Sequence, residues 1–496
     1  TLTQTVGAMS KLVVTLAGQT FTDGSTTSGS GNSGTVIAQT AGTSFNLSKL
    51  TATDQFFNIV TSYSGAKTIG YSGPGGLPVF TTAVDFTSGQ STTTLATTLT
   101  KAETTTLTVN DGTITGPAGS SLTVNAGAIS QLQLLMPGET SAPGTATGKT
   151  GTPSAQTAGT AFNVIVRSVD AYWNLVSSTR TINLTSSDPN ATLPANFALS
   201  AGTRTRSVTF KTAGSATVTA TDTTVSGPLT ANTGEVTAIN AGTVVKLQIL
   251  VPGETASPGS STGKTAATPS AQTAGTAIIA GIVVNAVDAN WNVVSSSNPT
   301  VAISSTDTNA AVVDDNGASA GTVTLAAGTA TLSSFTFKTA GPRTITATHT
   351  SGTLTAKISP NITVNAGPVP QLQILLPGET ASPGSASGKT GTPNAQTAAV
   401  AIANGIVVRA VDANWNLVTT ATPTVSLGSA DAYAVIADDN GVSSGHLTLV
   451  AGTRTLSSFT FTAAGTRTIT ATDTTSALAA NTSGNITVNA GTAVKL

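Results

Sequence analysis

The sequence predicts an all-β protein, built as a tandem array of β-sandwich domains without a helical domain. Three observations support this prediction. Thr, Ala, Gly, Ser and Val dominate the composition, and β-branched residues of this kind favour strands. Long phrases recur along the chain, which indicates a repeat architecture. Apolar residues alternate with other residues in short runs bounded by Gly- and Asp-rich turns, as expected for strands.

Three phrases define the repeats. The first, PGETASPGSASGKTGTP from Pro377, has close copies from Pro137 and Pro252. The second is V-D-A-x-W-N, with the divergent counterpart ATDQFFNIV from Ala52. The third is a closing phrase such as KTAGSATVTATDTT from Lys211. The N-terminal part of the chain has only a degenerate opening phrase, KLVVTLAGQT, and we expect it to lack the GKT loop.

Domain boundaries follow from a glycine that recurs in one register, usually within N-A-G. It occurs at Gly7, Gly127, Gly242, Gly367 and Gly491, at spacings of 120, 115, 125 and 124 residues. We therefore predict repeat 1 (residues 7–126, divergent), repeat 2 (127–241), repeat 3 (242–366) and repeat 4 (367–490). Residues 1–6 match the closing strand of a preceding repeat, and residues 491–496 match the opening strand of a following one.

The strand before the second phrase shows the alternation that defines a half-buried strand. Val164, Val166 and Ser168 share one face, and Arg167 lies on the other. Repeats 3 and 4 show the same pattern, with Asn285 and Arg409 at the position of Arg167. Short strands of this kind in units of about 120 residues predict a β-sandwich in each repeat.

These phrases resemble bacterial immunoglobulin-like (Big-type) repeats of large secreted surface proteins and adhesins. The resemblance covers the whole chain and is carried by V-D-A-x-W-N, SSDPNATLP from Ser186 and the KTAG…TVTATD ending. Many members of that family have a D-x-x-G-N turn, so Trp173, Trp291 and Trp415, with Phe57 in repeat 1, stand where glycine is common. The resemblance implies an Ig-like fold and an extracellular or cell-surface location. Such repeats serve as stalks, binders and filament parts, so it does not fix one function.

The GKT phrase is close to a phosphate-binding loop but does not match one. That loop needs G-x-x-x-x-G-K-[ST] followed by a helix, whereas only three residues separate Gly384 from Gly388 here. A proline follows each copy, and no helix is expected. We predict an exposed connecting loop that binds no nucleotide.

A covalent cross-link is the next hypothesis, because a Glu and a Lys recur together in each opening phrase, as with Glu139 and Lys149. Such a link needs a buried lysine beside Asn or Asp. We expect these lysines to be solvated in a Gly/Ser-rich loop, so we do not predict it.

Calcium binding is the one metal hypothesis. Asp314, Asp315, Asp438 and Asp439 lie in two DDNG sequences and offer the oxygen ligands that calcium prefers. DDNG is also a common turn, and the other repeats lack it. We therefore predict no cofactor and treat calcium as a secondary hypothesis.

Composition excludes several function classes. The chain has 20 basic and 21 acidic residues, so no basic surface for nucleic acid is expected. It has no cysteine and no run of 18 apolar residues, so neither disulfides nor a membrane span is expected. The two histidines lie in different repeats, and no Ser-His-Asp set recurs. We predict that the protein is not an enzyme.

The tryptophans are the most informative side chains, and two interpretations remain open for them. Each is either a core residue, or lies in a turn at one end of its sandwich and packs on the next unit. We take the second phrase as the repeat signature and candidate interdomain contact, comprising Phe57, Trp173, Trp291, Trp415, Asp54, Asp170, Asp288 and Asp412.

The leading functional hypothesis is a structural subunit of an extracellular bacterial filament or surface rod. Its partner would be a second copy of the chain, or the repeat array would simply continue. The alternatives are an adhesin or binding module, with a glycan or other surface ligand bound by the unusual loops of repeat 1 around Gly73, and the stalk of a larger secreted enzyme.

Overall fold

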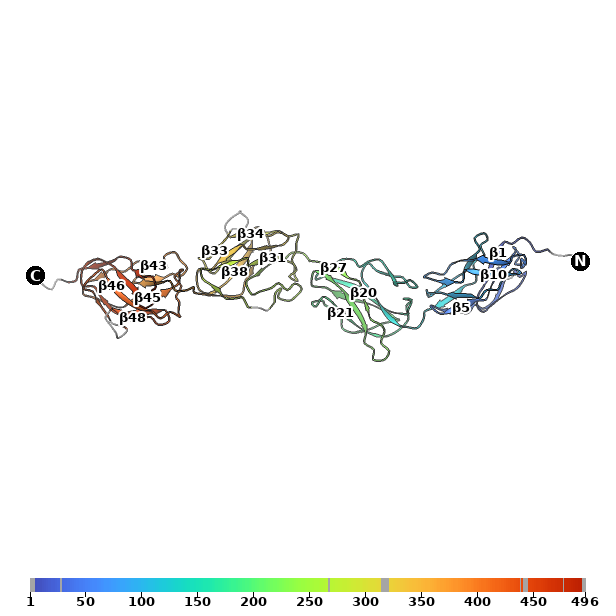
Figure 1. Cartoon of the computed structure of the whole chain (residues 1–496), viewed down its shortest axis with the longest axis horizontal. Helices are drawn as coiled ribbons and strands as arrows, with labels where there is room; N and C mark the ends of the chain where they lie inside the picture. The colour runs from blue at the N-terminus through green and yellow to red at the C-terminus, as the bar shows by residue number, and fades with distance from the viewer. Residues whose placement is uncertain are drawn as a thin grey trace. The chain divides into compact units, whose positions relative to one another are not determined.

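Every regular element that the computed structural model describes is a β-strand (Figure 1). The structure describes residues 5–26, 29–265, 268–313, 321–437, 439, 445–475 and 477–492. The chain divides into two compact units, Thr1–Asn240 and Ala241–Leu496. The prediction of an all-β fold is confirmed.

The first unit contains the strands of repeats 1 and 2. Those of repeat 1 are β1 (Lys11–Thr15), β2 (Gln19–Phe21), β3 (Asn32–Gly34), β4 (Gln39–Thr40), β5 (Ser44–Leu47), β6 (Lys49–Thr53), β7 (Gly65–Thr68), β8 (Gly70–Ser72), β9 (Val79–Phe80), β10 (Ala83–Thr87), β11 (Gln90–Ser91), β12 (Leu95–Thr98), β13 (Glu103–Thr105), β14 (Thr108–Asn110) and β15 (Leu122–Asn125). Those of repeat 2 are β16 (Gln131–Leu135), β17 (Thr140–Ser141), β18 (Lys149–Thr150), β19 (Gln156–Thr157), β20 (Ala161–Val169), β21 (Thr181–Ser186), β22 (Phe197–Ala198), β23 (Thr203–Thr209), β24 (Gly214–Ala216), β25 (Val218–Asp222), β26 (Asn232–Thr233) and β27 (Thr237–Asn240).

The second unit contains the strands of repeats 3 and 4. Those of repeat 3 are β28 (Lys246–Leu250), β29 (Gln272–Thr273), β30 (Ala277–Ile279), β31 (Val283–Val287), β32 (Thr300–Ser305), β33 (Ala311–Val312), β34 (Thr322–Thr324), β35 (Thr329–Thr331), β36 (Ser334–Thr336), β37 (Gly341–Arg343), β38 (Ile345–His349), β39 (Lys357–Ile358) and β40 (Ile362–Asn365). Those of repeat 4 are β41 (Gln371–Leu375), β42 (Glu379–Ala381), β43 (Lys389–Gly391), β44 (Gln396–Thr397), β45 (Ala401–Val411), β46 (Thr424–Ser429), β47 (Val435–Ile436), β48 (His446–Thr448), β49 (Thr453–Thr460), β50 (Gly465–Arg467), β51 (Ile469–Asp473), β52 (Asn481–Thr482) and β53 (Ile486–Asn489).

Repeat 4 shows the sandwich most completely. One sheet has the strand order β41-β45-β49-β47, and the other has the order β48-β46-β51-β52. A small third sheet joins β44 in parallel to β53, the last strand of the repeat. Inward residues of both main sheets, such as Ile374, Val408 and Leu427, belong to one hydrophobic cluster. Repeat 2 has the same arrangement, with β16-β20-β23 and β22-β21-β25-β26.

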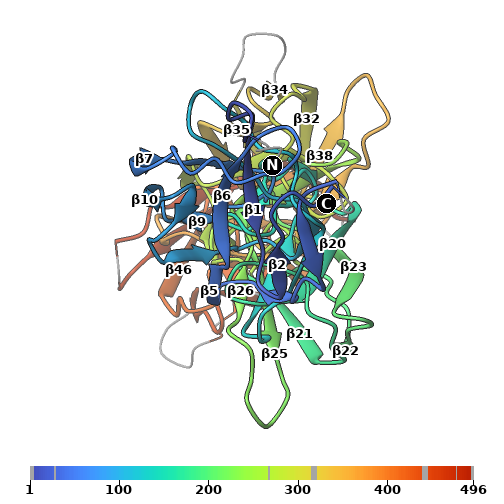
Figure 2. The ribbon, with the colours of Figure 1, turned by 90° about the vertical axis from the view of Figure 1, so that its right-hand side faces the viewer.

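Repeat 1 departs from this pattern in its sheets. Its main sheet has the order β1-β6-β11-β10-β7, in which β1 pairs antiparallel with β6 (Figure 2). The pair β14-β8 forms a separate two-stranded sheet. The parallel pairing of the first short strand with the closing strand is retained, here between β4 and β15.

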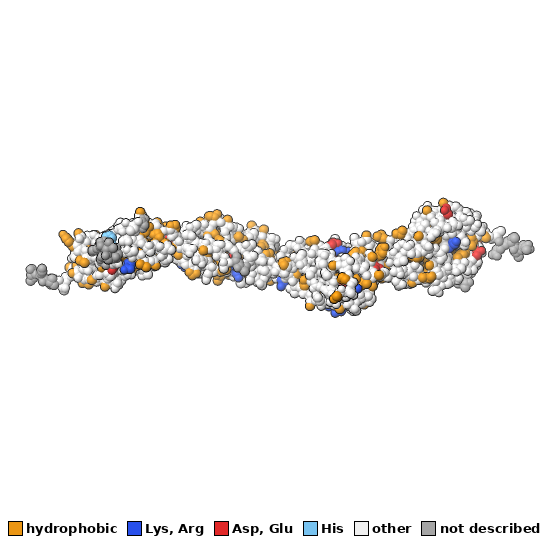
Figure 3. Space-filling view, turned by 60° about the horizontal axis from the view of Figure 1, so that its bottom comes forward, with side chains coloured by type: hydrophobic (Ala, Val, Ile, Leu, Met, Phe, Trp, Pro, Cys, Tyr) orange, Lys and Arg blue, Asp and Glu red, His pale blue; other side chains and the backbone are white. Residues whose placement is uncertain are grey.

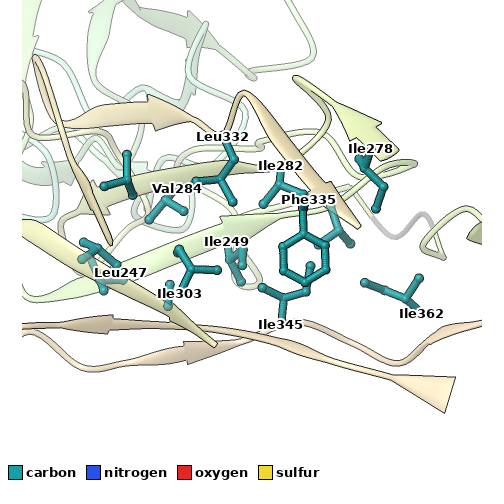
Figure 4. Close-up of a cluster of buried hydrophobic side chains, with 14 of the residues drawn as sticks. Leu247, Ile249, Ile278, Ile282, Val284, Ile303, Leu332, Phe335, Ile345 and Ile362 are labelled. Carbon is teal, nitrogen blue, oxygen red and sulfur yellow. The ribbon is translucent and has the colours of Figure 1, made fainter. Parts of the chain in front are cut away.

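Each hydrophobic cluster lies within the residues of one predicted repeat. The cluster of repeat 3 surrounds Phe335, whose ring lies among aliphatic side chains that include Ile249, Ile282 and Ile345 (Figure 4). The other three clusters lie within residues 12–124, 132–239 and 372–488. We therefore interpret the chain as four repeats, each with its own hydrophobic cluster. The two compact units each combine two of them.

The expected strand alternation is present. Val164, Val166 and Ser168 are completely buried, as are Ile345 and Ala347 in a closing strand. The predicted terminal strands fall largely on residues 1–4 and 493–496, which lie outside the described residues. The described parts of those segments, residues 5–6 and 491–492, belong to no strand. None of the described residues form a helix long and apolar enough to span a membrane.

Candidate functional site: the Asp-x-x-Trp-Asn turn

The second phrase forms a turn that is organised by its aspartate. In repeat 2, Asp170 Oδ1 accepts hydrogen bonds from the backbone amides of Tyr172 at 2.8 Å and Asn174 at 2.9 Å. Its Oδ2 accepts one from the amide of Gly127 at 2.7 Å. Asp54, Asp288 and Asp412 bind the corresponding glycines Gly7, Gly242 and Gly367. The recurrent glycine and the turn of each repeat are therefore held by one buried carboxylate.

The aromatic residue of each turn adopts a left-handed backbone conformation. This conformation costs an L-residue about 1–2 kcal/mol relative to the usual right-handed one, and glycine adopts it freely. A glycine at this position would avoid that cost. The φ angles are 63° at Phe57, 67° at Trp173, 68° at Trp291 and 65° at Trp415.

The indole ring packs on the GKT loop of its own repeat. A Cβ added to Gly148 would lie 2.1 Å from Trp173 Cγ, so the ring covers the glycine backbone directly. Trp173 Nε1 donates a hydrogen bond to the carbonyl of Ala146 at 3.3 Å. Repeats 3 and 4 pair Trp291 with Gly263 and Trp415 with Gly388 in the same way.

The loop has two further attachments to its own sandwich. Gln133 Nε2 donates to the Gly148 carbonyl at 2.7 Å, and Arg167 Nη1 donates to Gln133 Oε1 at 2.8 Å. Lys149 forms an ion pair with Glu139, whose side chain is buried. Equivalent pairs occur in repeats 3 and 4, where Lys389 Nζ lies 2.8 Å from Glu379 Oε1. The expectation that these lysines are solvated was wrong, because each closes the base of its loop through a buried carboxylate.

Repeat 1 contains a counterpart of this loop, contrary to the sequence-based expectation. Strands β2 and β3 form the same hairpin, and Gln19 and Asn32 replace the charged pair. Gln19 Oε1 accepts from the Leu16 amide at 3.3 Å, as Glu139 does from Met136. The sequence concealed the loop because it is longer and lacks the GKT letters.

The asparagine after the tryptophan contacts the preceding repeat. Within the first unit, Asn174 Nδ2 donates to the Thr100 carbonyl at 2.8 Å, and Asn174 Oδ1 accepts from the Ala102 amide at 2.7 Å. Asp170 fixes this amide group by accepting from the same Nδ2. We call this two-bond contact the asparagine clamp.

The second unit contains the same asparagine clamp. Asn416 Nδ2 donates to the Lys338 carbonyl at 2.8 Å, and Asn416 Oδ1 accepts from the Ala340 amide at 2.8 Å. Both partners are backbone groups, so the contact depends little on the side chains of the preceding repeat. The sequence did contain a signal for it, since Asn follows the aromatic residue in every copy.

Other groups pack beside each clamp. In the first unit, the Gly144 carbonyl accepts from the Leu77 amide at 3.1 Å and from Thr100 Oγ1 at 2.9 Å. The Tyr172 ring lies so near Gly42 that a Cβ there would be 2.0 Å from Tyr172 Cε2. In the second unit, a Cβ on Gly275 would lie 2.4 Å from Asn414 Nδ2.

The predicted signature residues therefore have distinct positions. The four aspartates organise the turns, and the tryptophans are half-buried against their own loops. Phe57 is buried, and a Cβ on Gly31 would lie 3.1 Å from its Cδ1. The asparagine side chain forms hydrogen bonds across the junction, and Tyr172 or Asn414 packs beside it.

The weak calcium candidates fall mostly outside the described residues, which include only Asp439 of the four. Asp439 Oδ2 accepts from the Ser457 amide at 2.8 Å. Among the described residues, no group of three or more His, Asp or Glu side chains is placed to hold a metal ion.

Several buried carboxylates have shifted pKa values. Burial alone would raise the pKa of Asp431, but hydrogen bonds from Ala463, Thr462 and Tyr433 outweigh it and lower the pKa below its usual value. Asp188 has a lowered pKa for the same reasons, through Thr212, Lys211 and Asn190. For Asp54 the bonds from Asn58, Gly7 and Phe56 overcome the effect of burial and lower the pKa. Through these hydrogen bonds each aspartate holds together the backbone segments that donate to it.

No family model and no curated protein matches the sequence. Among solved structures, domains 4–9 of the surface layer protein SbsC align with 97% of this chain, and the alignment covers 66% of the SbsC chain. The sequence identity is 18% and the TM-score is 0.17. Invasin, a bacterial integrin-binding protein, matches 91% of this chain and 78% of its own, at 14% identity and a TM-score of 0.24.

An enzyme is also similar in part: β-glucuronidase 3 of Bacteroides uniformis matches 42% of this chain and 23% of its own, at 14% identity and a TM-score of 0.18. The chain thus spans less than two thirds of both the surface layer structure and the glucuronidase. The residues described above define a protein of β-sandwich repeats with backbone-directed contacts between neighbours in each unit.

Proposed function

We propose that the chain is a non-catalytic structural subunit of an extracellular bacterial filament or surface rod. The observation that carries this proposal is the asparagine clamp, which is built with the same atoms in both units. The asparagine that recurs in each repeat binds one repeat to the next within each unit. Its chemistry therefore serves the junction between repeats.

The energy of the clamp is suited to this role. Each hydrogen bond of this kind contributes about 0.5–1.5 kcal/mol net, and leaving a buried backbone amide unpaired costs about 1–3 kcal/mol. Two bonds per clamp, with the packing of Tyr172 on Gly42, stabilise the docked arrangement. Breaking one clamp does not require unfolding of either sandwich.

The surface composition supports the same proposal. Only 8% of residues are charged, and Figure 3 shows a face on which charged side chains are few and scattered among hydrophobic and other uncharged groups. Little electrostatic repulsion then opposes close packing of neighbouring subunits. The absence of cysteine from all 496 residues is compatible with an extracellular site, where thiols would be oxidised.

The adhesin alternative depended on the unusual loop of repeat 1, GPGGLP from Gly73. That loop takes part in the junction with repeat 2, through the bond from the Leu77 amide to Gly144. The aromatic residues near it are also engaged: Tyr71 stacks on Phe80, and Tyr63 donates to Asp111 Oδ2 at 2.7 Å. No contact in this loop favours a ligand site over a structural role.

Immunogold electron microscopy of the source organism tests the proposal. Antibodies raised against the purified chain should label filaments or the cell surface in a regular pattern. Cells lacking the gene are the control, and labelling confined to the cytoplasm would overturn the proposed function.

A further inference from the structure

Strand β23 of repeat 2 has an open outer edge. It is the last strand of the order β16-β20-β23, and on its outer side Thr209 forms a single bridge with Thr192. These two residues exchange backbone hydrogen bonds of 2.8 and 3.0 Å, so the amide and carbonyl of Thr209 point away from β20. Because this direction alternates along an antiparallel strand, the backbone groups of Thr205 and Ser207 also point outward. Both residues are exposed.

Repeat 4 covers the equivalent edge with its own chain. The phrase A-G-T-R-T occurs in both repeats and aligns β23 with β49. The Ala437 amide donates to the Ser458 carbonyl at 3.1 Å, and Asp439 Oδ2 accepts from the Ser457 amide at 2.8 Å. Arg454 Nη2 donates to the Asp439 carbonyl at 3.2 Å. A segment with an aspartate therefore satisfies both the edge backbone and the arginine.

Repeat 2 lacks this covering segment. Ala201 follows Asp188 by 13 positions, whereas Ala451 follows Asp431 by 20 positions. The shorter connection of repeat 2, residues 189–200, contains no acidic residue. It therefore has no carboxylate to replace the one that repeat 4 uses at this edge.

The open edge of β23 carries two arginines on one face. Arg204 corresponds to Arg454 and is exposed, whereas Arg454 is half-buried. Arg206 replaces the buried Leu456, and its guanidinium lies 4.4 Å from the centre of the Phe197 ring. Among the described residues, no carboxylate forms an ion pair with either arginine of this edge. The edge thus combines outward backbone groups with two positive charges that are not neutralised.

We propose that the open edge of β23 binds an extended segment of another protein by strand addition. The segment pairs its backbone with Thr205 and Ser207. It has acidic residues at alternate positions, because side chains two residues apart lie on the same face and are then opposite Arg204 and Arg206. This inference goes beyond the proposed function, since it gives the surface rod a peptide-binding edge.

Charge favours a different protein over a second copy of these residues. Antiparallel pairing of two β23 strands can place Arg204 opposite Arg206, and like charges directly opposite each other are destabilising. No two acidic residues among the 496 are exactly two positions apart, so the chain contains no segment of the required pattern. Edge charges of this kind oppose pairing of identical strands and accept an acidic strand.

Fluorescence anisotropy of a labelled peptide with the purified full chain tests the proposal. The peptide TVTDVEVT has two acidic residues at alternate positions among strand-forming residues, and TVTNVQVT is its uncharged control. The acidic peptide should bind saturably, and the uncharged peptide should bind about tenfold more weakly. Hydrogen exchange should slow at the amides of Thr205 and Ser207 when the acidic peptide is bound.

Two variants separate the charges from the backbone. R204Q/R206Q removes both charges, and T205P removes an outward amide at a position where an edge strand tolerates proline. Each should bind the acidic peptide about tenfold more weakly than the wild type, with an unchanged circular dichroism spectrum. The control R454Q changes the equivalent arginine on the covered edge and should bind as the wild type does. The charge-reversed pair, R204E/R206E with the peptide TVTKVKVT, should restore binding.

The absence of saturable binding by the acidic peptide would overturn the proposal, as would equal binding of the uncharged peptide. Full binding by T205P would overturn it too, because the guanidinium groups would then hold an anion without strand pairing. None of these results would alter the immunogold labelling, so failure here is distinct from failure of the proposed function.

Discussion

The indole ring of Trp415 lies over Gly388, and a Cβ on that glycine would stand 2.3 Å from both Cγ and Cδ2 of the ring. Both residues have left-handed backbones, with φ of 65° and 75°. The conformational cost at the tryptophan is offset by this packing. The ring thereby couples the turn that carries the asparagine clamp to the GKT loop beside the junction.

The substitution Gly388→Ala should release this loop. The new methyl group would overlap the ring and also adopt an unfavourable φ, so we expect destabilisation of roughly 2–4 kcal/mol. Thermal unfolding of this variant should show a lower transition temperature for repeat 4 than in the wild type. Hydrogen exchange followed by mass spectrometry should show faster exchange over residues 382–390.

Gly428→Ala is the matched control for that variant. Gly428 lies in β46, and nothing lies within 4 Å of a Cβ added there. The control should keep wild-type exchange in the loop. If Gly388→Ala exchanges no faster than this control, the ring does not hold the loop.

Substitutions of Asn416 separate the two bonds of the clamp. Asn416→Ala removes both bonds, so the Ala340 amide should lose its protection from hydrogen exchange. Asn416→Asp keeps an acceptor for that amide but places an oxygen against the Lys338 carbonyl. We expect partial protection of the Ala340 amide in the Asp variant. In both variants, repeats 3 and 4 should melt separately and at a lower temperature than in the wild type.

Asn183→Ala is the control, because the Asn183 side chain donates to the exposed side chain of Asn196 and lies outside the junction. It should leave the Ala340 amide protected. Equal exchange of that amide in the wild type and in Asn416→Ala would show that the clamp contributes nothing to docking.

The strands and the sites were not equally predictable from the sequence. Alternation in β20 and β38 fixed the buried faces, because a half-buried strand must repeat with period two. The role of Trp173 was left open, since core and turn positions both accept tryptophan. The left-handed φ that distinguishes them is a property of the fold. The partner of Asn174 is a backbone carbonyl 74 residues away, which no local pattern encodes.

The structure also predicts the outcome of a nucleotide-binding experiment. In the GKT loop of repeat 4, both glycines already contact other groups of the protein. Gly384 donates its amide to the Asn414 carbonyl at 2.7 Å, and Gly388 lies under the Trp415 ring. Lys389 is paired with Glu379. Isothermal calorimetry with Mg-ATP should therefore give no saturable heat, and a binding isotherm abolished by Lys389→Gln would contradict this.

Acid should weaken repeat 4 through Asp431. Its pKa is lowered in the folded chain, while an unfolded aspartate has a pKa of about 3.9. The stabilisation is therefore fully present above about pH 4 and is lost as the pH falls toward and through the folded pKa.

Asp431→Asn should destabilise repeat 4 by about 2 kcal/mol at pH 7, because hydrogen bonds to a charged acceptor contribute about 1.5–3 kcal/mol and the amide presents an N–H group to backbone donors. Calorimetric melting between pH 2 and 7 should show the difference between wild type and Asp431→Asn shrinking below pH 4. Asp85→Asn, which removes an exposed carboxylate, serves as the control and should follow the wild type. A difference that stays constant down to pH 2 would show that the ionised form of Asp431 is not what braces Thr462 and Ala463.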